Sequence, residues 1–210
     1  MTSSSAAKRI LDIAGASIGL VLISPVLLAV GIAIVATMGR PVLFRQRRPG
    51  LDGRPFELVK FRTMLPATDP SRAQANDAGR LTPLGRFLRR TSLDELPELV
   101  NVLKGDMSLV GPRPLLMEYL DRYTPDQARR HHVRPGITGW AQVNGRNATT
   151  WDERFALDLW YVDNRSIGLD LRILGMTVGQ VLTRQGISAE GHATMPDFTG
   201  TVEPEPDEGD

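Results

Sequence analysis

The chain has 210 residues, a net charge of +1 and no cysteine, a length that suits one domain with its own hydrophobic core. The lack of cysteine excludes disulfides, thiolate nucleophiles and cysteine-bound metals, and three histidines leave little material for a histidine-based zinc site or catalytic triad. Of the 25 basic residues 22 are arginine, whose planar guanidinium binds phosphate and carboxylate groups through paired hydrogen bonds.

The first predicted element is an apolar segment at 10–38, in which Asp12 is the only charged residue. The segment is long enough to cross a hydrocarbon layer of about 30 Å, so we expect a membrane-bound protein. Basic residues flank both ends, so the positive-inside rule selects no orientation. The pair Ser24-Pro25 lies near the middle, where proline removes a helix hydrogen bond. A re-entrant helix-break-helix and an ordinary kinked transmembrane helix both fit these residues.

A β-hairpin is predicted next, with strands at 42–46 and 56–61 and a turn at Asp52-Gly53. Lys60 and Arg62 are two residues apart, so we expect both side chains on one face of the second strand.

A short helix is predicted from "TPLGRFLRR", with Thr82 as its N-cap and Pro83 as its first residue. Its last residues, Arg89 and Arg90, come directly before an acidic pair. Further along, "LVGPRPL" holds Arg113 between two prolines, which restrict the backbone around that side chain.

The acidic pair, Asp94 and Glu95, lies in "TSLDELPELVNVLKGDMSLVGPRP" at 91–114 and admits two interpretations. Ser92 followed by Glu95 is a capping-box pattern, and acidic residues stabilise a helix N-terminus. Against capping, Pro97 falls where a helix begun at Ser92 needs a backbone donor. The alternative is a catalytic pair among converging cations, a site for a polyanion with a divalent metal bridging the carboxylates and phosphate oxygens.

The C-terminal half contains "RPGITGWAQVNGRN", which predicts a tight loop and a short strand. Two helices are predicted after it, the first opening with a capping box from Thr150 to Glu153. Four nearby aromatics suit either a membrane-interface belt or core packing: Trp140, Trp151, Trp160 and Tyr161. The last eight residues hold five acids and no base, which predicts a disordered tail.

Taken together, these segments resemble the small monotopic phosphoglycosyl transferases, also called bacterial sugar transferases. The resemblance runs from about Lys8 to Ile187 in consistent order. It rests on the Ser24-Pro25 break, "KFRTM" at 60–64, "SLDELPELVNVLKGDMSLVGPRP" at 92–114 and "RPGITGWAQVNGRN" at 134–147. The chain is without the extra transmembrane helices and central domain of larger members, so it resembles the minimal form.

The resemblance implies transfer of a sugar phosphate from a UDP-sugar to polyprenol (undecaprenyl) phosphate, with release of UMP, as the first membrane step of bacterial glycan and exopolysaccharide synthesis. Asp94 matches the family's nucleophile, which carries a covalent phospho-sugar, and Glu95 lies beside it. Such a carboxylate is ionised at neutral pH without a histidine. Mg²⁺ is the implied cofactor, held by Asp94 and Glu95. The positions implied to bind phosphate are Lys60, Arg62, Arg89, Arg113 and Arg146.

The implied fold is α+β and mainly helical. A re-entrant membrane helix at 1–39, broken at Ser24-Pro25, precedes a cytoplasmic catalytic domain at 40–190 with a β-hairpin and interfacial amphipathic helices. An acidic, disordered tail at 191–210 follows. The resemblance places the catalytic domain on the cytoplasmic face of the bacterial inner membrane, in contact with membrane lipids. Downstream glycosyltransferases are further expected partners.

Two other functions fit the residues. A membrane-associated hydrolase of nucleotide sugars or pyrophosphate would use the acidic pair to bind a metal and activate water, without a covalent adduct. A membrane-anchored scaffold would use its basic face for anionic lipids and tolerate Asp94→Asn. Nucleic-acid binding is disfavoured, because aromatic residues are not interleaved with the arginines.

Overall fold

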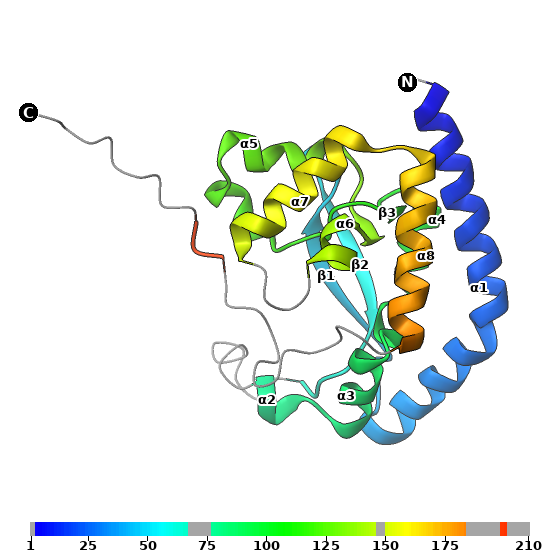
Figure 1. The fold of residues 1–210 in the computed structure, drawn as a ribbon. Helices are drawn as coiled ribbons and strands as arrows, with labels where there is room; N and C mark the ends of the chain where they lie inside the picture. The colour runs from blue at the N-terminus through cyan, green and yellow to red at the C-terminus, as the bar shows by residue number, and fades with distance from the viewer. Residues whose placement is uncertain (1–2, 67–76, 146–149, 184–197, 201–210) are drawn as a thin grey trace, which may run out of the picture.

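The computed structural model describes residues 3–66, 77–145, 150–183 and 198–200. Helices dominate these residues, and two small two-stranded sheets lie among them (Figure 1). The strands β1 and β2 pair in an antiparallel manner, whereas β3 and β4 pair in parallel. The predicted mainly helical α+β fold is therefore confirmed.

The long helix α1, Ser3–Met38, descends along one side of the molecule and then turns beneath it (Figure 1). Pro25 lies inside this helix, and proline is a common cause of such a change of direction. The hydroxyl of Ser24 donates to the carbonyl of Val21 at 2.8 Å. That carbonyl is the acceptor which the missing N–H of residue 25 would have used. The Ser-Pro pair thus bends a continuous helix, rather than separating two helices, and leaves no acceptor unpaired at the bend.

Most of α1 is apolar and exposed. Its most apolar window, within Ala6–Met38, has a mean hydropathy of 2.8, and only 11% of that window is buried. Val21 and Leu22 are 73% and 74% exposed. A soluble protein rarely leaves so large an apolar surface in water. The helix is long and apolar enough to cross a membrane, and its exposure is consistent with membrane association.

The predicted hairpin is confirmed, although its first strand is longer than expected. Strand β1, Leu43–Pro49, pairs with β2, Pro55–Phe61, and a short 3₁₀ turn at Leu51–Gly53 (η1) joins them. Asp52 has a φ of 54°, a left-handed conformation that aspartate accepts more readily than most residues. The turn predicted at Asp52-Gly53 therefore joins the two strands.

Two short helices follow, α2 at Asp77–Arg80 and α3 at Pro83–Arg90. Thr82 caps α3 by accepting a hydrogen bond from the amide of Gly85 at 2.9 Å, as the sequence predicts. The segment after α3 contains η3 (Leu93–Glu95), α4 (Glu98–Lys104) and β3 (Ser108–Val110). The remaining elements are η4 (Met117–Arg122), α5 (Pro125–Ala128), η5 (Arg129–His132), β4 (Gly136–Thr138), α6 (Trp140–Asn144), α7 (Trp151–Asn164) and α8 (Ile167–Thr183).

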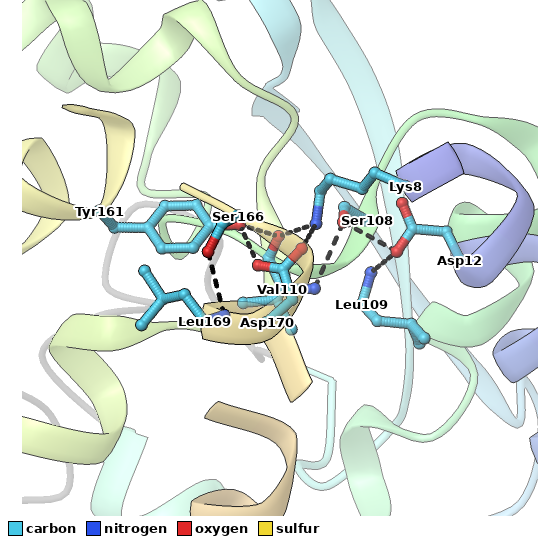
Figure 2. A network of polar contacts seen from close by, with 9 residues as sticks. All are labelled: Lys8, Asp12, Ser108, Leu109, Val110, Tyr161, Ser166, Leu169 and Asp170. Atoms are coloured by element: carbon cyan, nitrogen blue, oxygen red, sulfur yellow. Dashed lines mark hydrogen bonds and ion pairs between the residues drawn. The ribbon is translucent and has the colours of Figure 1, made fainter. Parts of the chain in front are cut away.

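A polar network fastens the beginning of α1 to β3 and α8 (Figure 2). The ammonium of Lys8 lies 2.6 Å from a carboxylate oxygen of Asp170, whose other oxygen accepts a hydrogen bond from Tyr161. Asp12 accepts hydrogen bonds from the hydroxyl of Ser108 at 2.9 Å and from the amide of Leu109 at 3.0 Å. Asp12, the acid inside the apolar segment, therefore fixes α1 to β3.

The other end of α1 is fastened to the same body by Arg62. Its guanidinium donates to the carbonyls of Met38, Gly39 and Arg40, at 2.6, 2.5 and 3.3 Å. These carbonyls have lost their helical partners where α1 ends, so a buried arginine satisfies them. Both ends of α1 are therefore bound to one globular unit.

Of the four aromatic residues noted in the sequence, two pack in the core and two are placed as a membrane interface would require. Tyr161 is buried, and Trp151 packs against Tyr119 and Phe155 in an aromatic cluster. Trp140 and Trp160 stack with ring centroids 4.6 Å apart, and Trp160 remains largely exposed. Core packing explains the first pair, whereas the partly exposed stack of Trp140 and Trp160 suits a membrane interface.

Candidate active site

The acidic pair lies in a 3₁₀ turn, and the capping-box interpretation of Ser92 is wrong. Ser92 has a left-handed backbone with φ 55°, and its side chain caps no helix. Asp94 and Glu95 belong to η3, and α4 begins only at Glu98, with Pro97 as its N-cap residue. The proline that obstructed the capping interpretation thus marks the true start of the helix, because proline is tolerated there and not further inside.

Two cations hold Glu95. The ammonium of Lys60 lies 2.8 Å from Oε1, and the guanidinium of Arg113 binds both carboxylate oxygens, with a short contact to Oε1. Burial alone would raise the pKa of Glu95, but the charges of Arg113 and Lys60 lower it far below its usual range. Glu95 is therefore a permanently ionised anchor for two cationic side chains.

Asp94 is placed differently, although it is adjacent in sequence. Its residue is 9% exposed, and within the described part of the chain its carboxylate accepts no hydrogen bond and forms no ion pair. Burial and the charge of Glu95 raise the pKa of Asp94, while Lys60, Arg113 and Arg89 act in the opposite direction. An unpaired carboxylate among nearby cations is free to react with an electrophile that those cations attract.

A third carboxylate, Glu98, was not predicted from the sequence. Its side chain is almost completely buried, and its Oε1 lies 3.0 Å from the ammonium of Lys60. Burial raises the pKa of Glu98 to about 7, partly offset by the charge of Lys60. Lys60 thus lies between Glu95 and Glu98. The signal was the spacing, because residues 95 and 98 are three apart and fall on one side of a helical turn.

Helix α3 brings Arg89 to the site through a close approach of two backbones. A Cβ atom on Gly85 would lie 1.9 Å from the carbonyl oxygen of Thr63, so only glycine allows α3 to pack this tightly. The guanidinium Nε of Arg89 donates to the hydroxyl of Thr63 at 3.1 Å. The "KFRTM" segment thereby orients an arginine whose charge acts on Asp94.

Arg113 is held through its main chain as well as by Glu95. Arg130 donates to the carbonyl of Arg113 at 2.8 Å and forms an ion pair with Asp158 at 2.7 Å. The side chains of Arg130 and Asp158 are 2% and 3% exposed. This pair was missed in the sequence because its members are 28 residues apart and carry no local pattern.

Asn101 locks α4 onto the strand that carries Lys60. Its side-chain oxygen accepts from the amide of Val59 at 3.1 Å, and its amide nitrogen donates to the carbonyl of Glu57 at 2.7 Å and to Asp106 at 3.2 Å. Asn101 is fully buried. Its side chain therefore forms the hydrogen bonds that a further strand would make with the main chain of β2. These bonds fix α4 to β2 and so fix the distance from Lys60 to η3.

We expect Asn101→Ala to lower the free energy of unfolding by about 2–3 kcal/mol, because it leaves the buried amide of Val59 and the partly buried carbonyl of Glu57 without these partners. Thermal unfolding of the detergent-solubilised protein measures this loss. Asn164→Ala is the matched control, since Asn164 is exposed and donates only to the carbonyl of Trp160. Equal losses in the two variants would contradict the locking role of Asn101.

The sequence places the chain in a known family. Residues 3–184 match the family described as bacterial sugar transferase. The chain belongs to this family.

Individual relatives agree with this assignment. The chain is 55% identical over 195 residues to the uncharacterized sugar transferase EpsL of Bacillus subtilis, covering 92% of this chain and 96% of that protein. It is 43% identical over 182 residues to the UDP-glucose:undecaprenyl-phosphate glucose-1-phosphate transferase of Escherichia coli, covering 81% of this chain and 39% of that protein. It is 42% identical over 187 residues to the UDP-N-acetylgalactosamine-undecaprenyl-phosphate N-acetylgalactosaminephosphotransferase of Aeromonas hydrophila, covering 85% of this chain and 44% of that protein.

In this bacterial sugar transferase, three of the five predicted phosphate-binding residues gather at the acidic pair: Lys60, Arg89 and Arg113. Arg62 does not join them, because its guanidinium caps the C-terminal end of α1. The alternation of side chains along a strand was not sufficient to predict this separation, since β2 ends between the two residues. Arg146 lies outside the described residues.

The donor set of this sugar transferase limits how a metal ion could bind. Among the described residues, no group of three or more histidine, cysteine or acidic side chains is arranged to hold a metal. Both oxygens of Glu95 are already bound to cations, whereas those of Asp94 have no partner among the residues that the structure describes. Mg²⁺ commonly uses one or two carboxylates and completes its shell with water and substrate phosphates. The residues present therefore fit a Mg²⁺ ion held mainly by Asp94 together with a substrate.

Proposed function

We propose that this enzyme transfers a sugar phosphate from a UDP-sugar to polyprenol phosphate, which is undecaprenyl phosphate in bacteria, and releases UMP. The observation that carries the proposal is the buried carboxylate of Asp94, which has no partner within the described part of the chain and feels the charges of Lys60, Arg89 and Arg113. This geometry supports a covalent phospho-sugar on Asp94 as the intermediate. The names of the relatives support a UDP-sugar donor and an undecaprenyl phosphate acceptor.

The reaction has two displacements at phosphorus. In the first, a carboxylate oxygen of Asp94 attacks the β-phosphorus, the bond from that phosphorus to the bridging oxygen breaks, and UMP leaves with the electron pair. In the second, a phosphate oxygen of the lipid attacks the same phosphorus, and the bond to Asp94 breaks. The carboxylate is regenerated, and the product is a polyprenyl diphospho-sugar.

The cations lower the barrier by offsetting charge on the phosphoryl oxygens. Glu95 supports this role indirectly, because it fixes Lys60 and Arg113 in a single arrangement. Mg²⁺, when bound, would neutralise further phosphate charge. Asp94 is the carboxylate with free oxygens for it, and the participation of Glu95 would require release of at least one of its cations.

We propose that α1 is re-entrant, so that both its ends lie on the cytoplasmic side of the inner membrane. A straight helix of 36 residues would span about 54 Å, and a crossing helix would separate its ends by about 30 Å of hydrocarbon. Instead, Lys8 and Asp12 fasten one end of α1 to the catalytic body, and Arg62 fastens the other. The exposed apolar side chains of α8, including Leu171 and Val178, would then lie on the membrane interface.

An apolar groove of about 770 Å³ lies on the inner side of α1. Its walls come from α1, from Val42, Leu43 and Phe61 of the hairpin region, and from Pro97 and Val100 just after the acidic pair. Because all its lining residues are apolar and Pro97 lies three positions after Asp94 in the chain, we propose that the groove receives the isoprenoid chain of the acceptor.

Gly31→Leu tests this groove. The Cβ at residue 31 would make an ordinary contact with Val42 at 3.8 Å, so the rest of a leucine side chain fills the groove. We expect the KM for polyprenol phosphate to rise about tenfold, a loss of about 1.4 kcal/mol of binding, while adduct formation without lipid is unchanged. Gly175→Leu is the matched control, because Gly175 faces open space on α8. An unchanged KM in Gly31→Leu contradicts the assignment of the groove.

The proposed function is tested by intact-protein mass spectrometry of the enzyme in lipid nanodiscs, with Mg²⁺, a panel of UDP-sugars and no polyprenol phosphate. A sugar-phosphate increment together with UMP release supports the two-step reaction and identifies the sugar. Turnover without lipid and without an adduct would instead indicate a hydrolase. Binding of anionic vesicles with no turnover of any nucleotide sugar would favour the scaffold.

A further inference from the structure

Phe198 lies beyond the residues that match the family, 3–184, and inside the segment predicted to be a disordered tail. That prediction does not hold at this residue, because Phe198 is 2% exposed. Its ring contacts four aromatic rings, with centroids 5.0–5.8 Å away. These rings, Tyr119, Tyr123, Trp151 and Phe155, are here called the aromatic pocket.

The main chain of Phe198 is recognised as well as its ring. Arg122 donates to the carbonyl of Phe198 at 2.6 Å, and the amide of Phe198 donates to the hydroxyl of Tyr119 at 3.2 Å. Two main-chain hydrogen bonds and a buried ring define one register for this segment. Phe198 is therefore bound specifically, through its main chain and its ring, and not by hydrophobic contact alone.

The aromatic pocket also holds the arginine that supports Arg113. The guanidinium carbon of Arg130 lies 5.8 Å from the ring centroid of Tyr123 and 5.7 Å from that of Phe155, distances at which the rings attract the cation. Arg130 in turn donates to the main-chain carbonyl of Arg113. Phe198 stacks on Tyr123 and meets Phe155 edge to face, so it packs against both rings that hold Arg130.

We propose that Phe198 is a positioning residue for the transfer reaction: docked in the aromatic pocket, it holds Arg130 and, through Arg130, the main chain of Arg113. The inference rests on the proposed function, because Arg113 is the residue whose placement matters for the phosphates. Without Phe198, the pocket rings are exposed to water and free to change rotamer. The guanidinium of Arg130 is then no longer held by the rings of Tyr123 and Phe155, and the main chain of Arg113 is no longer held in one position.

A double-mutant cycle tests the connection, with the rate of adduct formation from the UDP-sugar as the readout. We expect Phe198→Ala to slow the wild-type enzyme about tenfold, since misplacing a phosphate-binding group by a fraction of an ångström has a large effect on rate. In an Arg113→Lys background the same change should slow the reaction less than about twofold, because the arrangement that Phe198 maintains is already lost.

Val143→Ala is the control for mere destabilisation. Val143 is buried in a hydrophobic cluster with Val110, Tyr161 and Ile173, which is separate from the cluster of Phe198, so its truncation weakens the fold and leaves the aromatic pocket in place. Its effect on the rate should be the same in both backgrounds. Equal effects of Phe198→Ala in the two backgrounds, or no effect of Phe198→Ala at all, would overturn the proposal.

Hydrogen exchange gives a second readout that does not depend on turnover. In the full-length protein, Phe198→Ala should speed hydrogen exchange at the amides of Arg113, Leu115 and Leu116, and Val143→Ala should not. If the wild-type enzyme forms no adduct from any UDP-sugar, the proposed function fails, and this measurement still decides the connection. Unchanged exchange at Arg113, Leu115 and Leu116 in Phe198→Ala overturns the connection.

Discussion

Asp94→Asn is expected to abolish the sugar-phosphate adduct and to slow UMP release at least about 1000-fold, as the loss of an essential nucleophile does in other enzymes. The amide has nearly the same size and shape as the carboxylate, but its oxygen is too weak a nucleophile to attack phosphorus. The fold should be unaffected, because the Asp94 carboxylate makes no hydrogen bond or ion pair within the described residues. Relief of the repulsion from Glu95 could even raise the melting temperature slightly.

Asp52→Asn is the matched control for this substitution. Asp52 lies in the turn of the hairpin with a positive φ, a conformation that asparagine also accepts, so both rate and stability should be retained. Full adduct formation by Asp94→Asn would exclude Asp94 as the nucleophile. Lipid-independent hydrolysis by the wild type, lost in Asp94→Asn without any adduct, would move the role of Asp94 from nucleophile to metal ligand.

The sequence predicted those parts of the site that depend on short motifs. Lys60, Arg89 and Arg113 were expected near the acidic pair because each stands in a recognisable motif beside a turn or a proline. The hairpin, the Thr82 cap and the Thr150 capping box were also predicted, since each depends on residues at most a few positions apart. Hydrogen bonds between residues close in the chain require particular residue types at fixed spacings, so they can be predicted from the sequence.

Other parts depend on contacts between distant segments and could not be read in this way. Asn101 bonds to Glu57 and Val59, and Arg130 bonds to Asp158, over separations of 28–44 residues. Ser92 was misassigned because the capping-box pattern was satisfied locally while Pro97 determined where the helix begins. Phe198 was assigned to the tail because its acidic surroundings gave no indication of the four rings that bury it.

The contacts that hold the two ends of α1, through Lys8 and Asp12 at one end and Arg62 at the other, also affect the position of the active site. Arg62 leaves the phosphate-binding set to cap α1, and its neighbour at position 60 points to Glu95 and Glu98. The end of strand β2 therefore contacts both the C-terminal end of α1 and two carboxylates of the site. With the apolar groove beside them, this arrangement would keep the site at the depth where a lipid phosphate meets a water-soluble nucleotide sugar.

Asp158→Asn is expected to lower the free energy of unfolding by about 3–5 kcal/mol, because it leaves the buried charge of Arg130 without its counterion. Arg130 still has the carbonyl of Arg113 and the hydroxyl of Tyr123 as acceptors, but neither carries a full negative charge. Chemical or thermal unfolding of the purified protein measures the loss. Asp163→Asn is the matched control, since Asp163 forms an exposed pair with the neighbouring Arg129, and its melting temperature should stay at the wild-type value.

Replacing both partners separates stability from catalysis. A buried ion pair exchanged for apolar side chains of similar volume often regains the stability that single substitutions lose, so Arg130→Met combined with Asp158→Leu should unfold nearer to the wild type than Asp158→Asn does. Its adduct formation should nevertheless remain slow, because methionine cannot donate to the carbonyl of Arg113. Recovery of both stability and rate would show that Arg113 is held well enough by Glu95 alone. Recovery of stability without rate would show that the pair exists to place an arginine at the phosphates.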